Sequence, residues 1–321
     1  MSVAPAVAVA VSAYNRSSLL AGLVAALKAQ TLAGFEAVIV DNGSTDDTSD
    51  VLRRCVGDDP RFTILRIEDN AGPAGARTLA WRSTTATWVA FTDDDCRPRP
   101  RWLEQLLEAS SSADVVQGRT MPAPTDDGEA PGWFDRTRQI ESWSGRYETC
   151  NLGVRRPTLE AVDGFDEQFP IAMGEDTDLG LRAVRAGART SFAAGAVVNH
   201  HVWPGTFREY LDERRRYSEV VQLMGANPDA RQLLIGGYVL RYSHLAMWAL
   251  VPVTVGSVAV GRWWVSPTIV GAWAIKNGLR HRRPGFSIPR GIGNHGLKLA
   301  AYAYETACFA RASARYRTLV I

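Results

Sequence analysis

Residues 88–95 read WVAFTDDD, a short apolar run that stops at three consecutive aspartates. Trp88–Thr92 has the length and composition of a buried strand, so the carboxylates follow its carboxyl end. Three carboxylates in that place repel one another and are costly to remove from water. A divalent cation that prefers hard oxygen ligands, Mg²⁺ or Mn²⁺, removes this cost and in turn neutralises a diphosphate. The competing interpretation is a solvated acidic turn before a helix that Pro100 begins.

The surrounding sequence repeats this pattern of a short apolar strand and a helix. The other expected strands are Ala6–Val11, Phe35–Val40, Phe62–Ile67 and Thr190–His201. Such alternation predicts an α/β fold with a mostly parallel sheet flanked by helices. Ligands of these sheets bind beyond the carboxyl ends of the strands. We therefore expect Asn15, Asp41 and Asn42, which each follow or end a strand, to meet the three aspartates in one crevice.

The overall composition narrows the class of function. The chain has 321 residues, which suggests about two domains. Its 36 Lys and Arg against 34 Asp and Glu give a net charge of +2, too balanced for nucleic acid as the main partner. The four cysteines lack CxxC spacing, so we expect reduced thiols of a cytosolic domain. GxxxxGK[ST] and GxGxxG are absent, which gives no support to a P-loop and weakens a dinucleotide oxidoreductase interpretation.

A second acidic cluster lies in GEDTDLGL, residues 174–181. Leu179, Leu181 and Val184 fit one side of a short helix. Glu175 and Asp176 therefore lie at the N-terminus of that helix, where the helix dipole favours negative charge without any function. A carboxylate in this place can also act as a general base on an acceptor hydroxyl. The residues alone leave both explanations open.

Two further segments carry candidate ligand-binding side chains. His200 and His201 end an apolar strand, and either is a candidate third metal ligand. Adjacent residues of an extended segment point to opposite sides, so only one of the two can serve. In NAGPAGAR, residues 70–77, the small side chains allow a close approach and Arg77 can reach a phosphate. The alternatives are a hydrogen-bonded histidine and an Arg77 held in a structural ion pair.

In this order, the segments resemble the inverting glycosyltransferases of family 2, which have the GT-A fold. The matching stretches are VSAYNR at 11–16, VDNGSTD at 40–46, NAGPAGAR at 70–77, DDD at 93–95, NLGVRR at 151–156, GFDE at 164–167 and EDTDL at 175–179. Each motif is weak alone, but the ordered set, over roughly residues 5–205, is specific. The resemblance implies a catalytic domain over residues 1–205, followed by a helical, partly apolar region over residues 206–321.

The resemblance also implies a nucleotide-sugar donor and the residues that bind it. The expected donor-binding residues are Ala13, Tyr14, Asn15, Asp41, Asn42, Arg77, Asp93, Asp94, Asn151 and Gly153. Of these, the first three would line the nucleotide pocket and Asp41 would contact the base or ribose. The last two, Asn151 and Gly153, would lie near the donor sugar.

A metal site and a base follow from the same resemblance. Asp93 and Asp95 match the outer positions of the family's DxD motif, with Asp95 as the firmer ligand. His200 matches a later metal-binding histidine, with His201 as the alternate. The expected cofactor is Mg²⁺ or Mn²⁺.

Asp176 matches the catalytic base of the family, and Glu175 would position the acceptor or the base. The implied reaction is a single displacement that inverts the anomeric carbon, with a glycan or a lipid-linked glycan as acceptor. Two alternatives come from other classes: nucleotidyl transfer, which also uses a Mg²⁺–carboxylate site, and a non-catalytic glycan-binding or membrane scaffold protein.

The last third of the chain contains two apolar runs, His244–Val260 and Trp263–Ile275. A membrane-spanning helix needs about 20 apolar residues, with a range of about 17 to 25. The first run meets the lower bound and the second falls short. Because arginines flank both runs, we expect a short membrane hairpin that holds the catalytic domain at the cytoplasmic face of the cell membrane. The alternative is a pair of buried or peripheral helices of a soluble domain.

Overall fold

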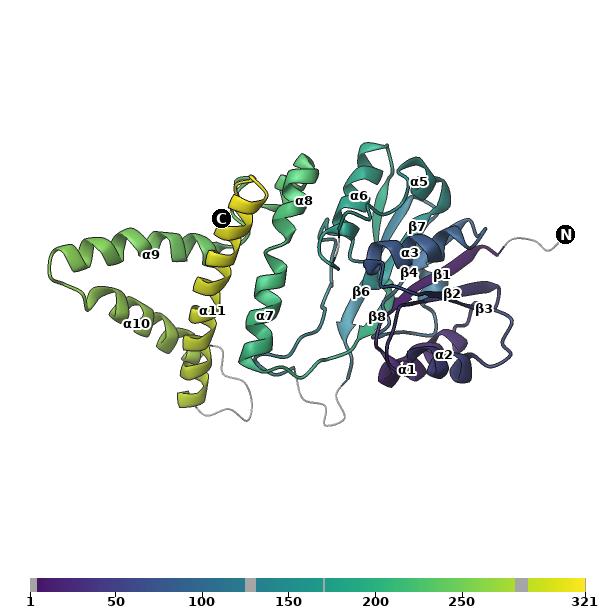
Figure 1. Ribbon diagram of the computed structural model, residues 1–321, viewed down its shortest axis with the longest axis horizontal. Coiled ribbons are helices and arrows are strands. Elements are labelled where there is room, and N and C mark those ends of the chain that lie inside the picture. Colours follow the sequence, from purple (N-terminus) through teal and green to yellow (C-terminus); the bar gives the residue numbers. More distant parts are fainter. Residues whose placement is uncertain (1–4, 125–130, 170, 281–287, 321) are drawn as a thin grey trace. The chain divides into compact units, whose positions relative to one another are not determined.

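The computed structural model describes residues 5–124, 131–169, 171–280 and 288–320. The chain divides into two compact units (Figure 1). The sheet unit comprises Met1–Pro131 and Arg136–Trp203, and the helical unit comprises Gly132–Asp135 and Pro204–Ile321. The boundary expected from the sequence, after residue 205, falls close to the end of the sheet unit.

The sheet unit contains an eight-stranded mixed sheet in the order β3-β2-β1-β4-β7-β6-β8-β5. The strands are β1 (Val7–Ala13), β2 (Phe35–Asn42), β3 (Phe62–Ile67), β4 (Trp88–Phe91), β5 (Cys96–Pro98), β6 (Val115–Pro122), β7 (Leu152–Arg155) and β8 (Thr190–His200). β1 to β4 form a parallel half, and β6 also runs parallel to β8. β7 and β5 are antiparallel to their neighbours.

The sequence did not reveal the strands β5, β6 and β7. β7 is four residues long and β6 contains Gly118, so neither has the long apolar run of a buried strand. Gly118 is needed for packing, because a Cβ there would lie 2.2 Å from the side-chain oxygen of Asn151. The sheet is therefore mixed, although four of its seven strand pairings are parallel as expected.

Helices pack against this sheet through apolar faces. The helices are α1 (Ser17–Lys28), α2 (Thr48–Val56), α3 (Gly72–Arg82), α4 (Trp102–Ala109), α5 (Arg156–Ala161) and α6 (Glu175–Arg185). In α1, Leu20, Leu23, Val24 and Leu27 recur at the spacing of one helix face, and all four are buried. The helix expected at Pro100 begins two residues later, a difference within the usual uncertainty of helix ends.

The register of the strands brings the polar strand ends to one edge. Ala13 of β1 pairs with Asp41 of β2, and Ala10 pairs with Phe91 at the end of β4. On the other side, Cys96 of β5 pairs with His200 at the end of β8. Residues that are more than 100 positions apart therefore meet beside the three aspartates.

The helical unit contains the remaining helices. They are α7 (Phe207–Tyr217), α8 (Val220–Ala226), α9 (Tyr242–Ala259), α10 (Val265–Arg280) and α11 (Ile288–Arg315). α7 begins with a capping box, in which Thr206 accepts from the backbone of Glu209 and the Glu209 carboxylate accepts from the backbone of Thr206. Over the described ranges, α9 is the helix long and apolar enough to cross a membrane, and only 11% of it is buried. It is not the core helix of this unit.

Candidate active site

Four side chains place a potential metal-ligand atom within 4.8 Å of one another: those of Asp93, Asp95, Cys96 and His200. The two aspartates follow β4, and the pairing of β5 with β8 brings the histidine to them. Carboxylate oxygens suit Mg²⁺ and Mn²⁺, and imidazole adds a nitrogen ligand. The donor set therefore fits a divalent cation, and it contains all three residues for which the sequence predicts metal binding.

Hydrogen bonds orient the side chains of this group. Asp95 Oδ2 accepts from Trp203 Nε1 at 2.9 Å, and Asp95 Oδ1 lies 3.5 Å from His200 Nε2. His200 Nδ1 lies 2.9 Å from the backbone oxygen of His201, which leaves Nε2 facing the carboxylate. The His201 ring instead packs edge-on against the Trp203 ring, with 4.6 Å between the ring centroids. Of the two histidines, His200 is the one whose ring nitrogen faces the aspartates.

Arg77 joins the two acidic motifs. Its side chain is buried, Nη2 donates to Asp93 Oδ1 at 2.8 Å, and Nη1 donates to Glu175 Oε1 at 2.7 Å. Both terminal nitrogens are thus engaged by carboxylates. This is the ion pair of the alternative interpretation. The phosphate contact of Arg77 stays a prediction, in which a phosphate would displace one of the two carboxylates.

Asp176 lies beside this ion pair at the N-terminus of α6. It is partly exposed, and Oδ1 accepts from the backbone N–H of Thr177 at 2.7 Å. Loss of hydration raises the pKa of Asp176 well above its ordinary value, and the neighbouring carboxylates of Glu175 and Glu148 raise it further. A carboxylate with a raised pKa binds a proton more tightly and is therefore a stronger base. A general base works best when its pKa lies near the operating pH, so this shift favours such a role.

Tyr14 and Asn15, which are expected to line a nucleotide pocket, directly follow the end of β1. Tyr14 is 41% exposed, and its backbone N–H donates to Asp94 Oδ2 at 3.1 Å. Asn15 has a φ of 51°, and its backbone N–H donates to Ser44 Oγ at 3.0 Å. Ala13 differs, because its side chain is packed in the hydrophobic core. It can contribute to the pocket only through its backbone.

Asp41 is fully buried and its oxygens are already engaged. Oδ1 accepts from the backbone of Ser44 at 3.0 Å, and Oδ2 accepts from Arg66 Nη1 at 2.6 Å and from the Ser49 hydroxyl. Burial opposes ionisation, but the hydrogen bonds from Ser44 and Ser49 and the charge of Arg66 hold the pKa of Asp41 below its ordinary value. The carboxylate is therefore ionised, and a base or ribose would reach it by displacing one of these partners.

Asn42 and Asn151 act as braces within the protein. The Asn42 side-chain amide donates to Asn70 Oδ1 and to the backbone oxygen of Gly72, and it accepts from the backbone N–H of Ala71. Asn151 is fully buried; its side chain accepts from Trp102 Nε1 at 2.8 Å and donates to backbone carbonyls of β6 and β8 at 2.8 Å each. Gly153 lies within β7, opposite Ala90 of β4. The amides of Asn42 and Asn151 thus order the strand ends, and the expected contacts of Asn42, Asn151 and Gly153 with the donor stay predictions.

Asp94 ties the end of β4 to the end of β1. Besides Tyr14, it binds Arg16, whose Nε donates to Oδ1 at 3.1 Å. Burial raises the pKa of Asp94 to about 7, against the lowering effect of Arg16. Asp94 is outside the group of four possible metal ligands. Asp94 positions the backbone of Tyr14 and the side chain of Arg16, and its expected contact with the donor stays a prediction.

Three residues of this region were not predicted from the sequence. Trp203 binds Asp95, Arg16 lies over the Trp203 ring at 4.9 Å, and Cys96 adds its thiol to the ligand group. The adjacency of Cys96 to the three aspartates was an available signal. No signal in the sequence indicated the contact between Trp203 and Arg16, because these residues meet only through the pairing of distant strands.

Two models of protein families match the sequence of this chain. The model of glycosyl transferase family 2 matches residues 8–155, and that of glycosyl transferase family group 2 matches residues 88–278. Glycosyltransferase AglE of Haloferax volcanii is 30% identical over 221 residues, which cover 66% of this chain and 71% of the relative. Succinoglycan biosynthesis protein ExoU of Rhizobium meliloti is 29% identical over 231 residues, which cover 66% and 67%.

Solved structures share the fold. Mannosyltransferase PcManGT from Pyrobaculum calidifontis, in complex with GDP-Man and Mn²⁺, superposes with a TM-score of 0.67 at 20% identity, over 97% of this chain and 87% of that one. TarS 1–349 of S. aureus, in complex with UDP, gives a TM-score of 0.50 at 16% identity over 97% and 91%. These neighbours have the GT-A fold that the sequence predicts. The chain belongs to glycosyltransferase family 2 and is a glycosyltransferase.

Proposed function

We propose that this enzyme transfers a sugar, with inversion, from a nucleoside-diphosphate donor to a hydroxyl of a glycan or a lipid-linked glycan, with Mg²⁺ or Mn²⁺ as cofactor. The contact of Arg77 with both Asp93 and Glu175 carries the proposal, because one guanidinium joins the expected metal site to the expected base motif. Family membership favours this reaction over nucleotidyl transfer and over a non-catalytic scaffold.

Asp93, Asp95 and His200 would hold the metal ion. Their ligand atoms lie close enough together for one cation, and Asp95 is held in place by Trp203. When bound, the ion supplies charge neutralisation to the departing diphosphate as a Lewis acid. The fold neighbour PcManGT was solved with GDP-Man and Mn²⁺, which supports a nucleotide-sugar donor and this class of ion.

Asp176 would accept the proton of the acceptor hydroxyl. The acceptor oxygen attacks the anomeric carbon from the face opposite the diphosphate, the bond to the diphosphate oxygen breaks, and the configuration inverts. Two features support the role of Asp176: its raised pKa and its place beside Glu175, which Arg77 holds. Glu175 itself is 2% exposed, which favours a positioning role over direct proton transfer.

The helical unit would associate with the cytoplasmic face of the membrane. Apolar residues of α9 and of the turn before α10 are exposed, among them Val255 at 65%, Val260 at 70% and Trp263 at 69%. Exposed apolar patches of this kind mark membrane or protein interaction sites, and tryptophan favours the membrane interface. The basic residues that flank the two helices favour the cytoplasmic side.

Donor binding and transfer can be tested separately. A panel of UDP-, GDP- and dTDP-sugars with Mn²⁺ is first screened by thermal shift, and release of the nucleoside diphosphate is then measured with the best donor. We expect Asp176→Asn to bind this donor normally but to lose transfer by about 10²–10⁴-fold. Asp163→Asn, at a surface ion pair, is the matched control and should be fully active. Normal turnover of Asp176→Asn would show that another group is the base.

A further inference from the structure

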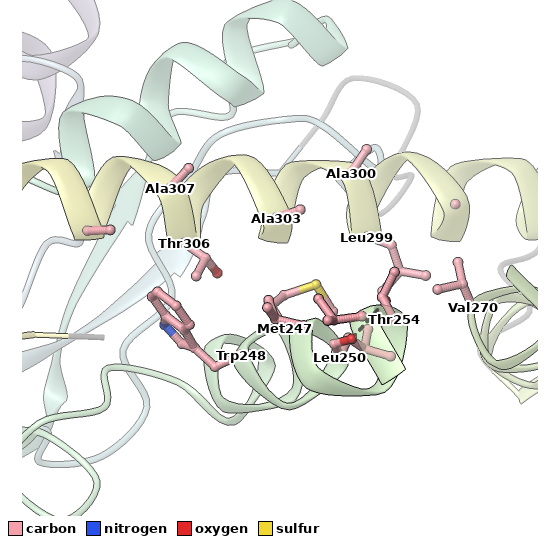
Figure 2. A pocket seen from close by; sticks show the side chains of 14 residues that line it. Met247, Trp248, Leu250, Thr254, Val270, Leu299, Ala300, Ala303, Thr306 and Ala307 are labelled. Carbon is pink, nitrogen blue, oxygen red and sulfur yellow. Dashed lines mark hydrogen bonds between the residues drawn. The ribbon is translucent and has the colours of Figure 1, made fainter. Parts of the chain in front are cut away.

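The helical unit contains an apolar cavity of about 720 Å³, far larger than a water site. It is lined by residues of α9 and α11 and by Val270 of α10, and we call it the α9–α11 groove. Its volume is in the range of small-molecule sites, about 300–1,000 Å³. Figure 2 shows Met247 and Trp248 of α9 facing Ala303 and Thr306 of α11 across the open space. None of the residues that line the groove is charged, so its lining suits a hydrocarbon better than a sugar or a nucleotide.

α11 shapes the groove by its small side chains. Gly296, Ala300, Ala303, Ala307 and Ala310 recur every three or four residues and line the same side of the helix. From Gly296 to Ala310 this stripe is about 21 Å long, at about 1.5 Å per residue. Side chains larger than alanine at these positions would fill the space, so the small residues of α11 keep the α9–α11 groove open.

The surroundings of the groove are apolar as well. α9 turns Met247 and Leu250 toward the groove, while Val253 and Val258, at 41% and 58% exposure, lie on its surface. A helix that is apolar on all sides belongs to a protein core or to a membrane, and α9 is only 11% buried. The groove is therefore continuous with a surface that a membrane would cover. The acyl chains of membrane lipids would then be the hydrocarbon next to the groove.

A buried polar cluster lies beside residues that line the groove. His244 lies one turn before Trp248, and its Nε2 is 3.2 Å from Oε2 of Glu305, the residue before Thr306. Arg214 Nη1 lies 3.6 Å from the same carboxylate. Both His244 and Glu305 are fully buried.

Positive charge exceeds negative charge in this cluster. Arg241 also acts on Glu305 and lies over the ring of Tyr217 at 5.2 Å, so two guanidiniums share one carboxylate. The same imbalance extends over residues 204–321, which carry 16 Lys and Arg against 6 Asp and Glu. Such basic segments attract anionic lipid headgroups.

We propose that the α9–α11 groove binds one hydrocarbon chain of an anionic membrane phospholipid, with the phosphate of that lipid beside Arg214 and Arg241. The proposal rests on the membrane association described under the proposed function, and adds a defined site to it. It is independent of the chemistry at Asp176.

Groove filling tests the chain site. The probe is short-chain phosphatidylglycerol, added to the full-length protein and followed by native mass spectrometry. The wild type should bind one lipid per chain. Ala303→Leu with Ala307→Leu should weaken binding by about tenfold or more, because the new side chains occupy the groove. Ala314→Leu, on α11 but outside the groove, is the matched control and should bind as the wild type does. Equal binding by all three proteins would overturn the site.

The headgroup site is tested with the same probe. Arg241→Gln should remove the preference for phosphatidylglycerol over phosphatidylcholine of the same chain length, and Arg241→Lys should retain it. An unchanged preference in Arg241→Gln would overturn the headgroup assignment. A dimer of this protein that binds no lipid would overturn the whole proposal, because a second copy of the protein would then be the occupant of the groove.

Vesicle sedimentation separates this proposal from the membrane association on which it rests. The vesicles contain phosphatidylcholine with or without phosphatidylglycerol. If the wild type and the groove-filled variant sediment equally and neither binds the short-chain lipid, the association stands and the groove site fails. If short-chain lipid binds in the groove but no vesicle is bound, the site stands and the association fails.

Discussion

Replacing Arg77 with methionine keeps the length of the side chain and removes its charge. Arg77 is buried between Asp93 and Glu175, at 2.8 Å and 2.7 Å. Removing one partner of a buried ion pair leaves an uncompensated charge, which costs about 3–5 kcal/mol. For a sheet unit of this size each kcal/mol lowers the melting temperature by about 2–4 °C, so Arg77→Met should lower it by roughly 10 °C.

The two carboxylates should contribute unequally to this loss. The Glu175 side chain is 2% exposed, whereas that of Asp93 is 28% exposed and can be hydrated. Adding Glu175→Gln to Arg77→Met should therefore restore more stability than adding Asp93→Asn. The glutamine removes a charge that water cannot reach, and the asparagine removes one that water partly solvates.

Thermal unfolding of the full-length protein, followed by near-ultraviolet circular dichroism, measures these differences. The control is Arg82→Met, which breaks a surface pair whose side chains are 51% and 90% exposed. It should change stability by less than about 1 kcal/mol. Equal losses for Arg77→Met and Arg82→Met, or a larger rescue by Asp93→Asn than by Glu175→Gln, would refute the reasoning.

Three further outcomes are expected. Asp95→Ala should abolish the effect of Mn²⁺ on donor affinity in calorimetry, and an undiminished effect would reject the metal site. Because the pKa of Asp176 is raised, kcat/KM should rise with pH along a limb centred above about 4, the ordinary carboxyl value, and a limb at or below that value would contradict the base assignment. Gly180→Ala would place a Cβ 2.0 Å from the Tyr147 ring and should destabilise by about 1–3 kcal/mol or more, whereas Gly34→Ala, with nothing within 4 Å, should be neutral in the same melting experiment.

The strands β1 to β4 and β8 could be predicted because each is a local apolar run. Phe62–Ile67 was predicted with the bounds of β3, and the expected strand at Thr190–His201 differs from β8 by one residue. The grouping of Asp93, Asp95 and His200 was also predictable, since each ends or follows a strand. These features depend on residues near one another in the chain, where apolar periodicity is informative.

The hydrogen-bond partners in the site could not be predicted. Arg77 left two alternatives open until its contacts with Asp93 and Glu175 were known. The side-chain amide of Asn151 binds groups on three elements that only the folded sheet brings together, and its motif gave no sign of these partners. A side chain's partners depend on tertiary contacts, which leave no trace in the spacing of a motif.

Trp203 orients a carboxylate of the candidate metal site without being one of the four possible ligands. Its indole N–H donates to Asp95, and its backbone exchanges two hydrogen bonds with Arg136, so the ring is anchored within the sheet unit. Phenylalanine at this position would keep an aromatic ring but remove the only N–H that the side chain can donate. Asp95 would then lose this restraint while all four possible ligand side chains stayed unchanged.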